Sequence, residues 1–510
     1  MSKIKININN FNYVVTLPNM RYKRIIDYML SRLSTYGFRY DYRTKKSIRT
    51  LDKVYAGIID YKLEYRFHIN TLKNFILTLG NNGIGKEDVI ITRNGLFKPA
   101  KIDLSINKKY ILRDHQDDYQ SALLRNSAPT FQLVDLIMGG GKSLIAMSTV
   151  VKLNMRTMIM VLPKFIDKWK SDVLELTSVK ENEIAVIQGS GKLNKILAEF
   201  ESGNAEYKFI IVSIRTIHNY IKTYENNTDD EEFGYVTTPE MFLETMKVGV
   251  VVNDETHMEF HSVFRTALYF DTHMFIGLSA TLEDNDKNQT RMYDIMFPEG
   301  ARISGLLEHK PYVHVHAVRY EISDIKYVNY KRPQGYSHNL YEQSILHSNI
   351  FLRSYLKMVE YYVRTGHMER KSKGDKCVVY VASIRMATLL ANRFQDLYPE
   401  LDVRRYIEDD PYENIIEADL TVTTVLSAGV ALDIPNLTTL ISTISVRSVK
   451  AVKQLYGRLR KIDGKEVRYY TLYSKTIPNQ TSYYYSNKEL LDPLAYSWSL
   501  EQYDHLLMTR

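Results

Sequence analysis

Short apolar segments alternate with stretches of helical spacing along most of the chain, and this alternation limits the fold more than any other feature. It is typical of α/β folds built on parallel sheets. The first run of expected strands covers residues 131–137, 157–162, 209–212, 248–253 and 274–278. A second run begins at Lys376 and continues through residues 420–424, 439–443 and 467–472. The sequence therefore predicts two α/β units in series.

The length of 510 residues exceeds what one hydrophobic core usually supports, so about three domains are expected. We predict four segments: a small basic α+β accessory domain over 1–105, a first α/β domain over 106–305, a second with its connector over 306–475, and a tail over 476–510. The connector is expected at 305–345, an exposed acidic insertion at 225–240, and a Tyr-rich polar loop with a short helix in the tail. In the accessory domain, residues 3–16 alternate like an edge strand and residues 20–33 have helical spacing.

Composition restricts the class of protein. With 45% hydrophobic and 25% charged residues, the chain has the balance of an ordinary soluble globular protein. Its only cysteine, Cys377, excludes an intrachain disulfide framework and a thiolate zinc cluster. The N-terminus has no apolar signal core, and 18 consecutive apolar residues occur nowhere. We expect a cytoplasmic protein that is not secreted and has no membrane partner.

Positive charge is concentrated at the N-terminus. Residues 1–100 hold 18 Lys and Arg against 7 Asp and Glu, a net charge of +11, whereas the other 410 residues sum to about −3. Such a block suits a polyanion, because Lys and Arg release counterions from phosphates. Five of these cations interleave with aromatic residues, namely Arg39, Arg43, Lys45, Lys46 and Arg49. The pattern fits a nucleic-acid strand, but a twisted hairpin with exposed charges fits it equally well.

The segment IMGGGKS, residues 137–143, follows an expected strand and opens a helical stretch. Gly139, Gly140 and Gly141 allow a tight turn whose N–H groups face phosphate oxygens. Lys142 would contact the β and γ phosphates, and the Ser143 hydroxyl would bind Mg²⁺. The strict P-loop pattern has Gly where this chain has Leu136. A glycine-rich turn followed by a chance Lys-Ser is the alternative.

An acidic pair ends the strand expected at 248–253. Asp254 would hold Mg²⁺, and Glu255 would polarise the water that attacks the γ-phosphate. The ends of parallel strands are where open α/β sheets bind ligands, although acidic pairs are common there. We expect His257 to be a coupling residue, because no second ligand stands at metal-site spacing.

Three motifs occur in the order found in superfamily 2 helicases, and the chain resembles that family. They are Gly141-Lys142-Ser143, Asp254-Glu255-Thr256-His257 and Ser279-Ala280-Thr281. The resemblance implies two tandem RecA-like domains that bind ATP and Mg²⁺ between them. It also implies that Ser279 and Thr281 couple hydrolysis to the nucleic-acid path. Taken alone, Ser-Ala-Thr is an ordinary turn.

Further segments extend the resemblance over about residues 105–475. In LRDHQ (112–116), Gln116 would read the adenine edge, with Arg113 nearby. MVLPKF (160–165) and IVSIRTI (211–217) match segments that grip the nucleic-acid backbone. The residues assigned to that backbone are Pro163, Lys164, Ser213 and Arg215.

The second unit supplies the late motifs of the family. CVVYVASIR (377–385) matches its opening, and SAGVALDIPNL (427–437) places Gly429 and Asp433 at the nucleotide. In QLYGRLRK (454–461), Gln454, Gly457 and Arg458 fit the family pattern. The next arginine, Arg460, stands one position early, so either Arg458 or Arg460 is the arginine finger. Two arginines on a solvated helix are the alternative.

A narrower likeness concerns the accessory domain and residues 341–363, which are similar to parts of the phage UvsW-type recombination helicases. It implies a monomeric ATP-dependent DNA helicase or translocase that remodels branched DNA in recombination, repair and replication. If the chain is phage-encoded, it would act in the host cytoplasm. Two alternatives remain open: an RNA helicase or transcript-release translocase, and a non-hydrolysing nucleic-acid clamp latched by ATP.

Overall fold

The computed structural model describes residues 3–41, 46–136, 139–227, 233–279, 287–307, 310–333, 335–407, 410–411, 413–425 and 434–510, without the side chains of 38–47 and Lys450. The chain divides into two compact units, the first ending at Leu307 and the second at Arg510. Each unit is organised around a seven-stranded sheet.

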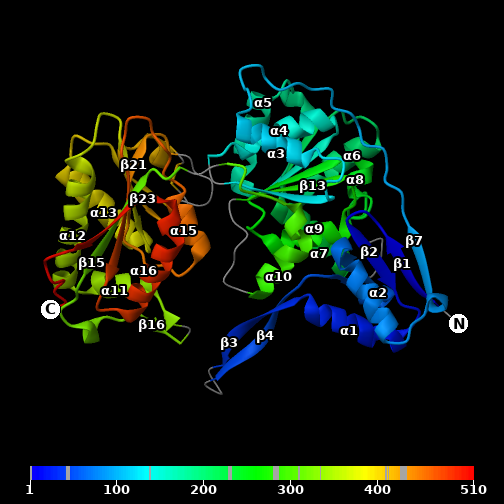
Figure 1. The fold of residues 1–510 in the computed structure, drawn as a ribbon, viewed down its shortest axis with the longest axis horizontal. Helices are drawn as coiled ribbons and strands as arrows, with labels where there is room; N and C mark the ends of the chain where they lie inside the picture. The colour runs from blue at the N-terminus through cyan, green and yellow to red at the C-terminus, as the bar shows by residue number, and fades with distance from the viewer. Residues whose placement is uncertain are drawn as a thin grey trace. The chain divides into compact units, whose positions relative to one another are not determined.

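The N-terminal part of unit 1 is a small α+β domain (Figure 1). Its mixed sheet has the order β5-β6-β2-β1-β7. The strands are β1 (Ile4–Ile8), β2 (Asn12–Thr16), β5 (Gly57–Ile59), β6 (Glu64–His68) and β7 (Val89–Arg93). Helices α1 (Lys23–Arg32) and α2 (Leu72–Asn81) belong to the same domain. The edge strand expected at 3–16 is instead two strands, and β1 lies inside the sheet because both β2 and β7 pair with it.

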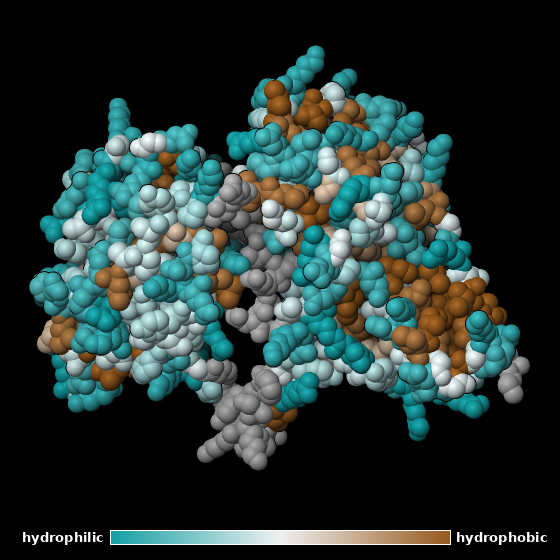
Figure 2. Space-filling view, in the orientation of Figure 1, coloured by the Kyte–Doolittle hydropathy of each residue, from teal (hydrophilic) through white to brown (hydrophobic). Residues whose placement is uncertain are grey.

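The basic aromatic segment forms a separate hairpin. Strands β3 (Ser34–Asp41) and β4 (Lys46–Val54) pair only with each other among the described strands. The hairpin follows α1 directly and extends away from the small domain's sheet (Figure 1). Hydrophobic side chains also reach the surface of this domain, where Figure 2 shows them gathered near β1, β2 and α2. Exposed examples include Ile76, Leu77, Ile90 and Ile91.

The larger sheet of unit 1 is parallel, in the order β10-β11-β9-β12-β13-β8-β14. Its strands are β8 (Phe131–Asp135), β9 (Thr157–Val161), β10 (Ile184–Ile187), β11 (Phe209–Ser213), β12 (Val250–Asp254), β13 (Met274–Ser279) and β14 (Arg302–Ile303). The helices around it are α3 (Asp114–Leu123), α4 (Lys142–Leu153), α5 (Ile166–Leu176), α6 (Ser190–Glu201), α7 (Ile214–Asn226), α8 (Phe242–Thr245), α9 (Phe260–Tyr269) and α10 (Lys287–Met296). All five strands expected in this region are confirmed.

The small domain and the parallel sheet of unit 1 share one hydrophobic core. Phe131 on β8 packs against Phe11 and His68, with ring centroids 4.5 and 4.4 Å apart. The buried Asn12 amide donates to the carbonyls of Ala267 and Phe270 at 3.1 and 3.0 Å. These contacts bury apolar surface of the small domain and of the parallel-sheet domain against each other. The small domain is therefore a fixed part of unit 1.

Unit 2 holds a second parallel sheet, in the order β19-β20-β18-β21-β22-β15-β23. Its strands are β15 (Val313–Tyr320), β18 (Lys376–Val381), β19 (Val403–Tyr406), β20 (Leu420–Thr424), β21 (Leu437–Ser442), β22 (Val467–Ser474) and β23 (Ala495–Gln502). The helices are α11 (His338–His347), α12 (Asn349–Val363), α13 (Ile384–Leu397), α14 (Glu413–Glu417), α15 (Val449–Tyr456) and α16 (Pro478–Leu491). Two tandem RecA-like parallel-sheet domains after a small α+β domain are therefore confirmed.

Two sequence expectations for unit 2 are wrong. The connector expected at 305–345 contains β15, which pairs along its length with both β22 and β23. The tail contains a 14-residue helix, α16, and the edge strand β23 rather than a polar loop and a short helix. Two histidines interrupt the apolar pattern of β15, and serines alternate with aromatic residues in β23, so neither strand forms a continuous apolar run.

Two further observations concern membranes and cysteine. Within the described ranges, no helix combines the length and the apolar character that a bilayer crossing requires. Cys377 is buried in β18, and burial raises the pKa of its thiol. Its position explains why it behaves as a small core residue rather than as a reactive thiol.

Candidate functional site

The glycine-rich turn lies between β8 and α4, at the carboxyl end of its strand. Gly139 and Gly141 have φ angles of 82° and 88°, which side chains other than glycine rarely adopt. Gly140 sits over the side chain of Leu136, so close that a Cβ there would lie 2.5 Å from Leu136 Cγ. Leu136 thus fills the space beneath the turn, and the departure from the strict pattern leaves the phosphate-facing half in place.

Gln116 ties helix α3 to this turn. Its side chain is buried, it donates from Nε2 to the Gly140 carbonyl at 3.2 Å, and its Oε1 accepts from the Arg113 N–H at 3.0 Å. A Cβ on Gly141 would lie 2.1 Å from Gln116 Nε2. The structure therefore brings the predicted adenine-reading segment against the glycine-rich turn.

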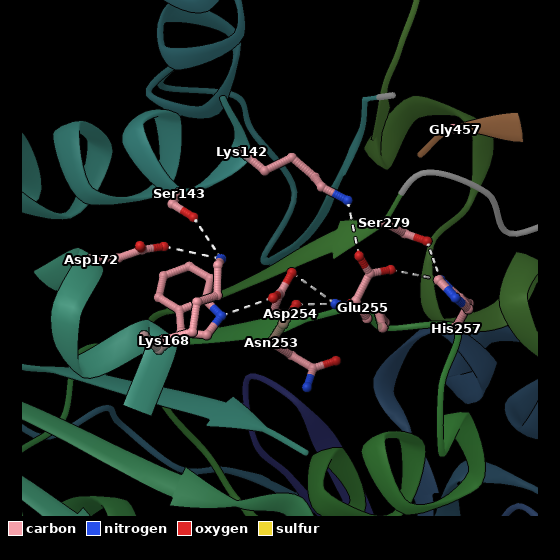
Figure 3. A network of polar contacts seen from close by, with 12 residues as sticks. Lys142, Ser143, Lys168, Asp172, Asn253, Asp254, Glu255, His257, Ser279 and Gly457 are labelled. Atoms are coloured by element: carbon pink, nitrogen blue, oxygen red, sulfur yellow. Dashed lines mark hydrogen bonds and ion pairs between the residues drawn. The ribbon is translucent and has the colours of Figure 1, made fainter. Parts of the chain in front are cut away.

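A line of polar contacts runs from Lys142 across the end of the sheet (Figure 3). Lys142 Nζ lies 3.3 Å from Glu255 Oε1, and Glu255 Oε2 lies 3.4 Å from His257 Nδ1. The same ring nitrogen lies 2.8 Å from the Ser279 hydroxyl oxygen. Glu255 and His257 are buried. Strands β12 and β13 are neighbours, which places the acidic pair and Ser279 side by side.

Glu255 also has an unusual backbone. Its φ of 49° lies in the left-handed region, which costs free energy for a residue with a side chain and occurs preferentially at functional sites. This conformation turns the chain directly after β12 and presents the Glu255 carboxylate to Lys142 (Figure 3).

Asp254 is held by two hydrogen bonds. Its Oδ2 accepts from the indole N–H of Trp169 at 2.8 Å, and its Oδ1 accepts from the Glu255 N–H at 3.0 Å. Burial raises the pKa of Asp254, and the charge of Glu255 raises it further, whereas Lys142, Lys168 and Trp169 oppose the rise. The two hydrogen bonds therefore orient the carboxylate, and an added positive charge nearby would lower its pKa.

The residues around Asp254 fit a divalent cation. Lys168 Nζ donates to Ser143 Oγ at 3.3 Å, and its charge lowers the pKa of Asp254. The hydroxyl and the carboxylate thus already face one positive charge, and both are oxygen ligands of the kind Mg²⁺ prefers. Lys168 is also paired with Asp172 at 3.0 Å, which gives it an alternative partner when a metal ion binds.

Sequence reasoning missed Trp169 and Lys168. Both lie on α5, just after MVLPKF. Trp169 contacts Asp254, which is 85 residues away in the sequence, and Lys168 contacts Ser143, which is 25 residues away. The only available signal was that Trp169 is one of two tryptophans in the chain. A tryptophan in a polar helix start indicates a buried partner for its N–H.

The residues predicted to grip nucleic acid lie at the same end of the sheet. Pro163 and Lys164 follow β9, and Ser213 ends β11, which pairs with β9. Ser213 is buried, whereas the side chain of Arg215 is exposed and lies 3.9 Å from Glu259. The structure groups these four residues at the carboxyl end of the sheet, where Lys164 and Arg215 are exposed and Pro163 is partly buried.

The late-motif residues lie in unit 2. Gln454 is on α15, and Arg458 and Arg460 follow that helix. Arg458 is buried, and its charge opposes the rise in the pKa of Tyr380 that burial causes. Arg460 is half-buried and donates to the Gly457 carbonyl at 3.3 Å. The two candidates for the arginine finger therefore differ in burial: Arg458 is buried, whereas Arg460 is partly exposed.

Some predicted residues fall outside the described part of the structure. These are Arg43, Lys45, Thr281, Gly429 and Asp433, together with the side chains of Arg39 and Lys46. Arg49 is described: it is exposed, and its guanidinium lies 4.0 Å from the centroid of the Tyr36 ring. Within the described ranges, no group of three or more His, Cys, Asp or Glu side chains could hold a metal ion.

Comparison with known proteins is consistent with this geometry. Residues 109–284, about a third of the chain, match the family model described as "Type III restriction enzyme, res subunit". No curated protein sequence matches the chain. Together with the tandem RecA-like sheets, the family match supports a helicase-type ATPase of superfamily 2.

Solved structures with a similar arrangement share little sequence with the chain. Dbp5 from S. cerevisiae, bound to RNA and ADP BeF3, is 12% identical with a TM-score of 0.47, and the match covers 78% of this chain and 90% of that one. The helicase domain of Hef from Pyrococcus furiosus is 15% identical with a TM-score of 0.44, and the match covers 74% and 98%.

Proposed function

We propose that this protein is an ATP-dependent DNA helicase or translocase that remodels branched DNA, as the UvsW-type likeness implies. The observation that carries the proposal is the line of contacts from Lys142 through Glu255 and His257 to Ser279. It joins Lys142 of the glycine-rich turn to Ser279 at the end of β13, where the Ser-Ala-Thr motif that the family uses for coupling begins.

The chemistry follows from this line. Lys142 is paired with Glu255, so a bound triphosphate would attract the ammonium group and leave the Glu255 carboxylate available to polarise a water molecule. Ser143 and Asp254 would hold Mg²⁺, which supplies positive charge to the β and γ phosphates. Movement of Glu255 would then break its contact with His257, and restoring that contact would follow product release. Because His257 also contacts Ser279, each change would alter the position of Ser279.

Residues of unit 2 complete the proposal. We assign Gly429 and Asp433 to the nucleotide, Gln454 to catalysis, and Arg458 or Arg460 to the γ-phosphate as an arginine finger. A cation from a second RecA-like domain would make hydrolysis depend on domain closure. Replacing each arginine by alanine separately and measuring ATPase activity identifies the finger, since only its loss should lower the turnover rate strongly.

We assign the basic accessory domain, residues 1–105, to DNA binding. Its hairpin carries exposed Arg49 beside the Tyr36 ring, a pairing that serves phosphate and base together. Removing residues 1–100 would uncover Phe131 and the other core residues that pack on Phe11 and His68. Substitution of single charges is therefore the cleaner test of this assignment. We further propose a monomer located in the cytoplasm.

The test is a substrate panel with ATP and Mg²⁺: a four-way junction, a fork, a displacement loop, a tailed duplex and single-stranded RNA. We expect the branched DNAs to stimulate ATPase activity most and to be converted to products. Greater stimulation by RNA would favour the RNA helicase alternative. Binding of ATP without phosphate release in any mixture would favour the latched clamp and contradict the proposal.

A matched pair of variants tests the hairpin. Arg49→Gln with Lys53→Gln should make the fall of log affinity with log salt less steep by about 1 to 2. Each lost phosphate contact reduces the magnitude of that slope by about 0.9. The control, Lys192→Gln with Lys195→Gln on α6, removes the same charge from another exposed surface of unit 1. Equal slopes for the two double variants would remove the hairpin from the DNA-binding surface.

A further inference from the structure

Three helices of unit 1 surround a surface cleft beside the hairpin. Helices α1, α2 and α10 contribute its walls, and its volume is about 280 Å³. Its polar lining residues include Tyr28, Arg32, Asn70, Asn74, Thr78 and Arg291. The helices belong to the same unit, and α10 also contacts β3 of the hairpin (Figure 1).

Two arginines in this cleft lie close together without an acidic counterpart. Arg291 donates to the Arg32 carbonyl, and Arg32 Nη1 donates to the Tyr28 hydroxyl at 2.9 Å. Neither guanidinium forms an ion pair with any carboxylate that the structure describes. Burial lowers the pKa of Arg291, and the charge of Arg32 lowers it further. Two like charges in one cleft are unfavourable unless an anion shares it.

The remaining polar side chains of the cleft are neutral amides and hydroxyls, which can both donate and accept hydrogen bonds. The Asn74 side-chain amide makes no hydrogen bond with another described residue, whereas Thr78 and Asn70 are already used, donating to the carbonyls of Asn74 and Ile295 at 2.8 Å. Two guanidinium forks and one amide match the oxygens of a phosphate group. The exposed Tyr28 ring adds a face on which a base can stack.

The chain connects this cleft to the hairpin. Helix α1 ends at Arg32 and β3 begins at Ser34; the residue between them, Leu33, lines the cleft, so the cleft lies directly beside the start of the hairpin. We propose that the cleft binds a phosphodiester of a nucleic-acid strand and holds that strand at the base of the hairpin. This proposal rests on the proposed function. It adds a phosphate site outside the motor motifs, on surfaces contributed by both the accessory domain and α10.

The experiment compares two double variants of the full chain in salt titrations with a fluorescein-labelled fork. Arg32→Gln with Arg291→Gln removes the cleft charges. Lys73→Gln with Lys86→Gln removes two exposed charges of the accessory domain that do not line the cleft. We expect the cleft variant to bind roughly tenfold more weakly and its salt slope to fall by about 1 to 2, and the control slope to fall by less.

Further arms make the outcome decisive. Arg291→Lys keeps the charge and should restore part of the binding, and thermal unfolding at the wild-type temperature shows that the variants are folded. Equal slopes for the two double variants overturn the cleft proposal while leaving the proposed function intact. Displacement of the fork by poly-glutamate at matched ionic strength also overturns it, because a polycarboxylate has no phosphodiester. A wild-type protein that neither binds the fork nor is stimulated by it refutes the proposed function itself.

Discussion

The two parallel sheets have the same strand order, yet the segments that follow their first strands differ. Matched in chain order, β8 of unit 1 takes the place of β15 in unit 2, and β9 takes the place of β18. After β8 come three glycines, a lysine and a serine. After β15 comes a segment rich in tyrosine. The same strand order therefore carries two different segments at corresponding positions.

Hydrogen bonds in unit 2 show how that position is filled. The hydroxyls of Tyr320 and Tyr341 lie 2.8 Å apart, and the Tyr336 hydroxyl lies 2.7 Å from His338 Nδ1. Burial lowers the pKa of His338 to about 3, so its ring is neutral. The next junction, after β18, is occupied by the buried Glu342 carboxylate, which accepts from the N–H groups of Ala382 and Ser383 at 2.6 and 2.8 Å. At these two positions of unit 2 the chain's own side chains hydrogen-bond to one another and to the backbone N–H groups.

The largest expected effect compares the segment after β8 in unit 1 with the segment after β15 in unit 2. Lys142→Ala should lower ATPase activity at least about a thousandfold, because it removes the charge on the β and γ phosphates, while nucleic-acid binding should persist. Phosphate release and fork binding measure the two properties. Lys326→Ala, in the segment after β15, is the control and should keep full activity. Hydrolysis that survives the loss of Lys142 would show that the P-loop assignment is wrong.

The second prediction concerns the buried carboxylate of Glu342, which lies at the junction after β18 in unit 2. Burial raises the pKa of Glu342 from 4.5 to about 7, so the folded state holds its proton more tightly than the unfolded state. Its contribution to stability is complete below about pH 4.5 and is lost as the pH rises through about 7. Glu342→Gln should therefore reduce the loss of unfolding free energy between pH 5 and 8 by up to about 3 kcal/mol.

Equilibrium unfolding at several pH values measures this difference. Glu321→Gln serves as the control, because Glu321 is exposed and paired with Lys475 at 3.1 Å. A pH profile of the Glu342 variant that matches wild type would mean that the carboxylate is ionised when buried.

The third prediction compares the two tryptophans, one in each unit. Trp169→Phe removes the hydrogen bond to Asp254, and loss of a partner that orients a metal ligand typically costs roughly 10- to 100-fold in metal affinity or activity. Trp498→Phe should change neither, since the Trp498 indole N–H has no hydrogen-bond partner within the described residues. ATPase activity as a function of Mg²⁺ concentration measures the effect.

A second readout follows from the same pair. In the Trp498→Phe background Trp169 is the only tryptophan, and its fluorescence should change when MgATP binds next to Asp254. The contact would have no role if Trp169→Phe kept the wild-type Mg²⁺ dependence and this fluorescence were unchanged.

Local features of the chain were predictable. Every strand expected in the parallel sheets is present, because a buried strand is a short apolar run that a pattern reveals. The turn at Gly139–Gly141 and the pair Asp254 and Glu255 were found for a similar reason, since tight phosphate binding demands particular residue types at adjacent positions. Strand β15 was missed because its histidines interrupt the apolar pattern.

Residue order alone therefore settled which apolar runs become buried strands and where the glycine-rich turn and the acidic pair stand, since those properties depend on neighbours a few positions apart. Folding in three dimensions settled the rest. Trp169 meets Asp254, Arg32 meets Arg291, and Phe11 packs on Phe131 only because distant elements are brought together. Such pairings have no periodic signature, and their free energy comes from burial and hydrogen bonding that exist only after the sheets have assembled.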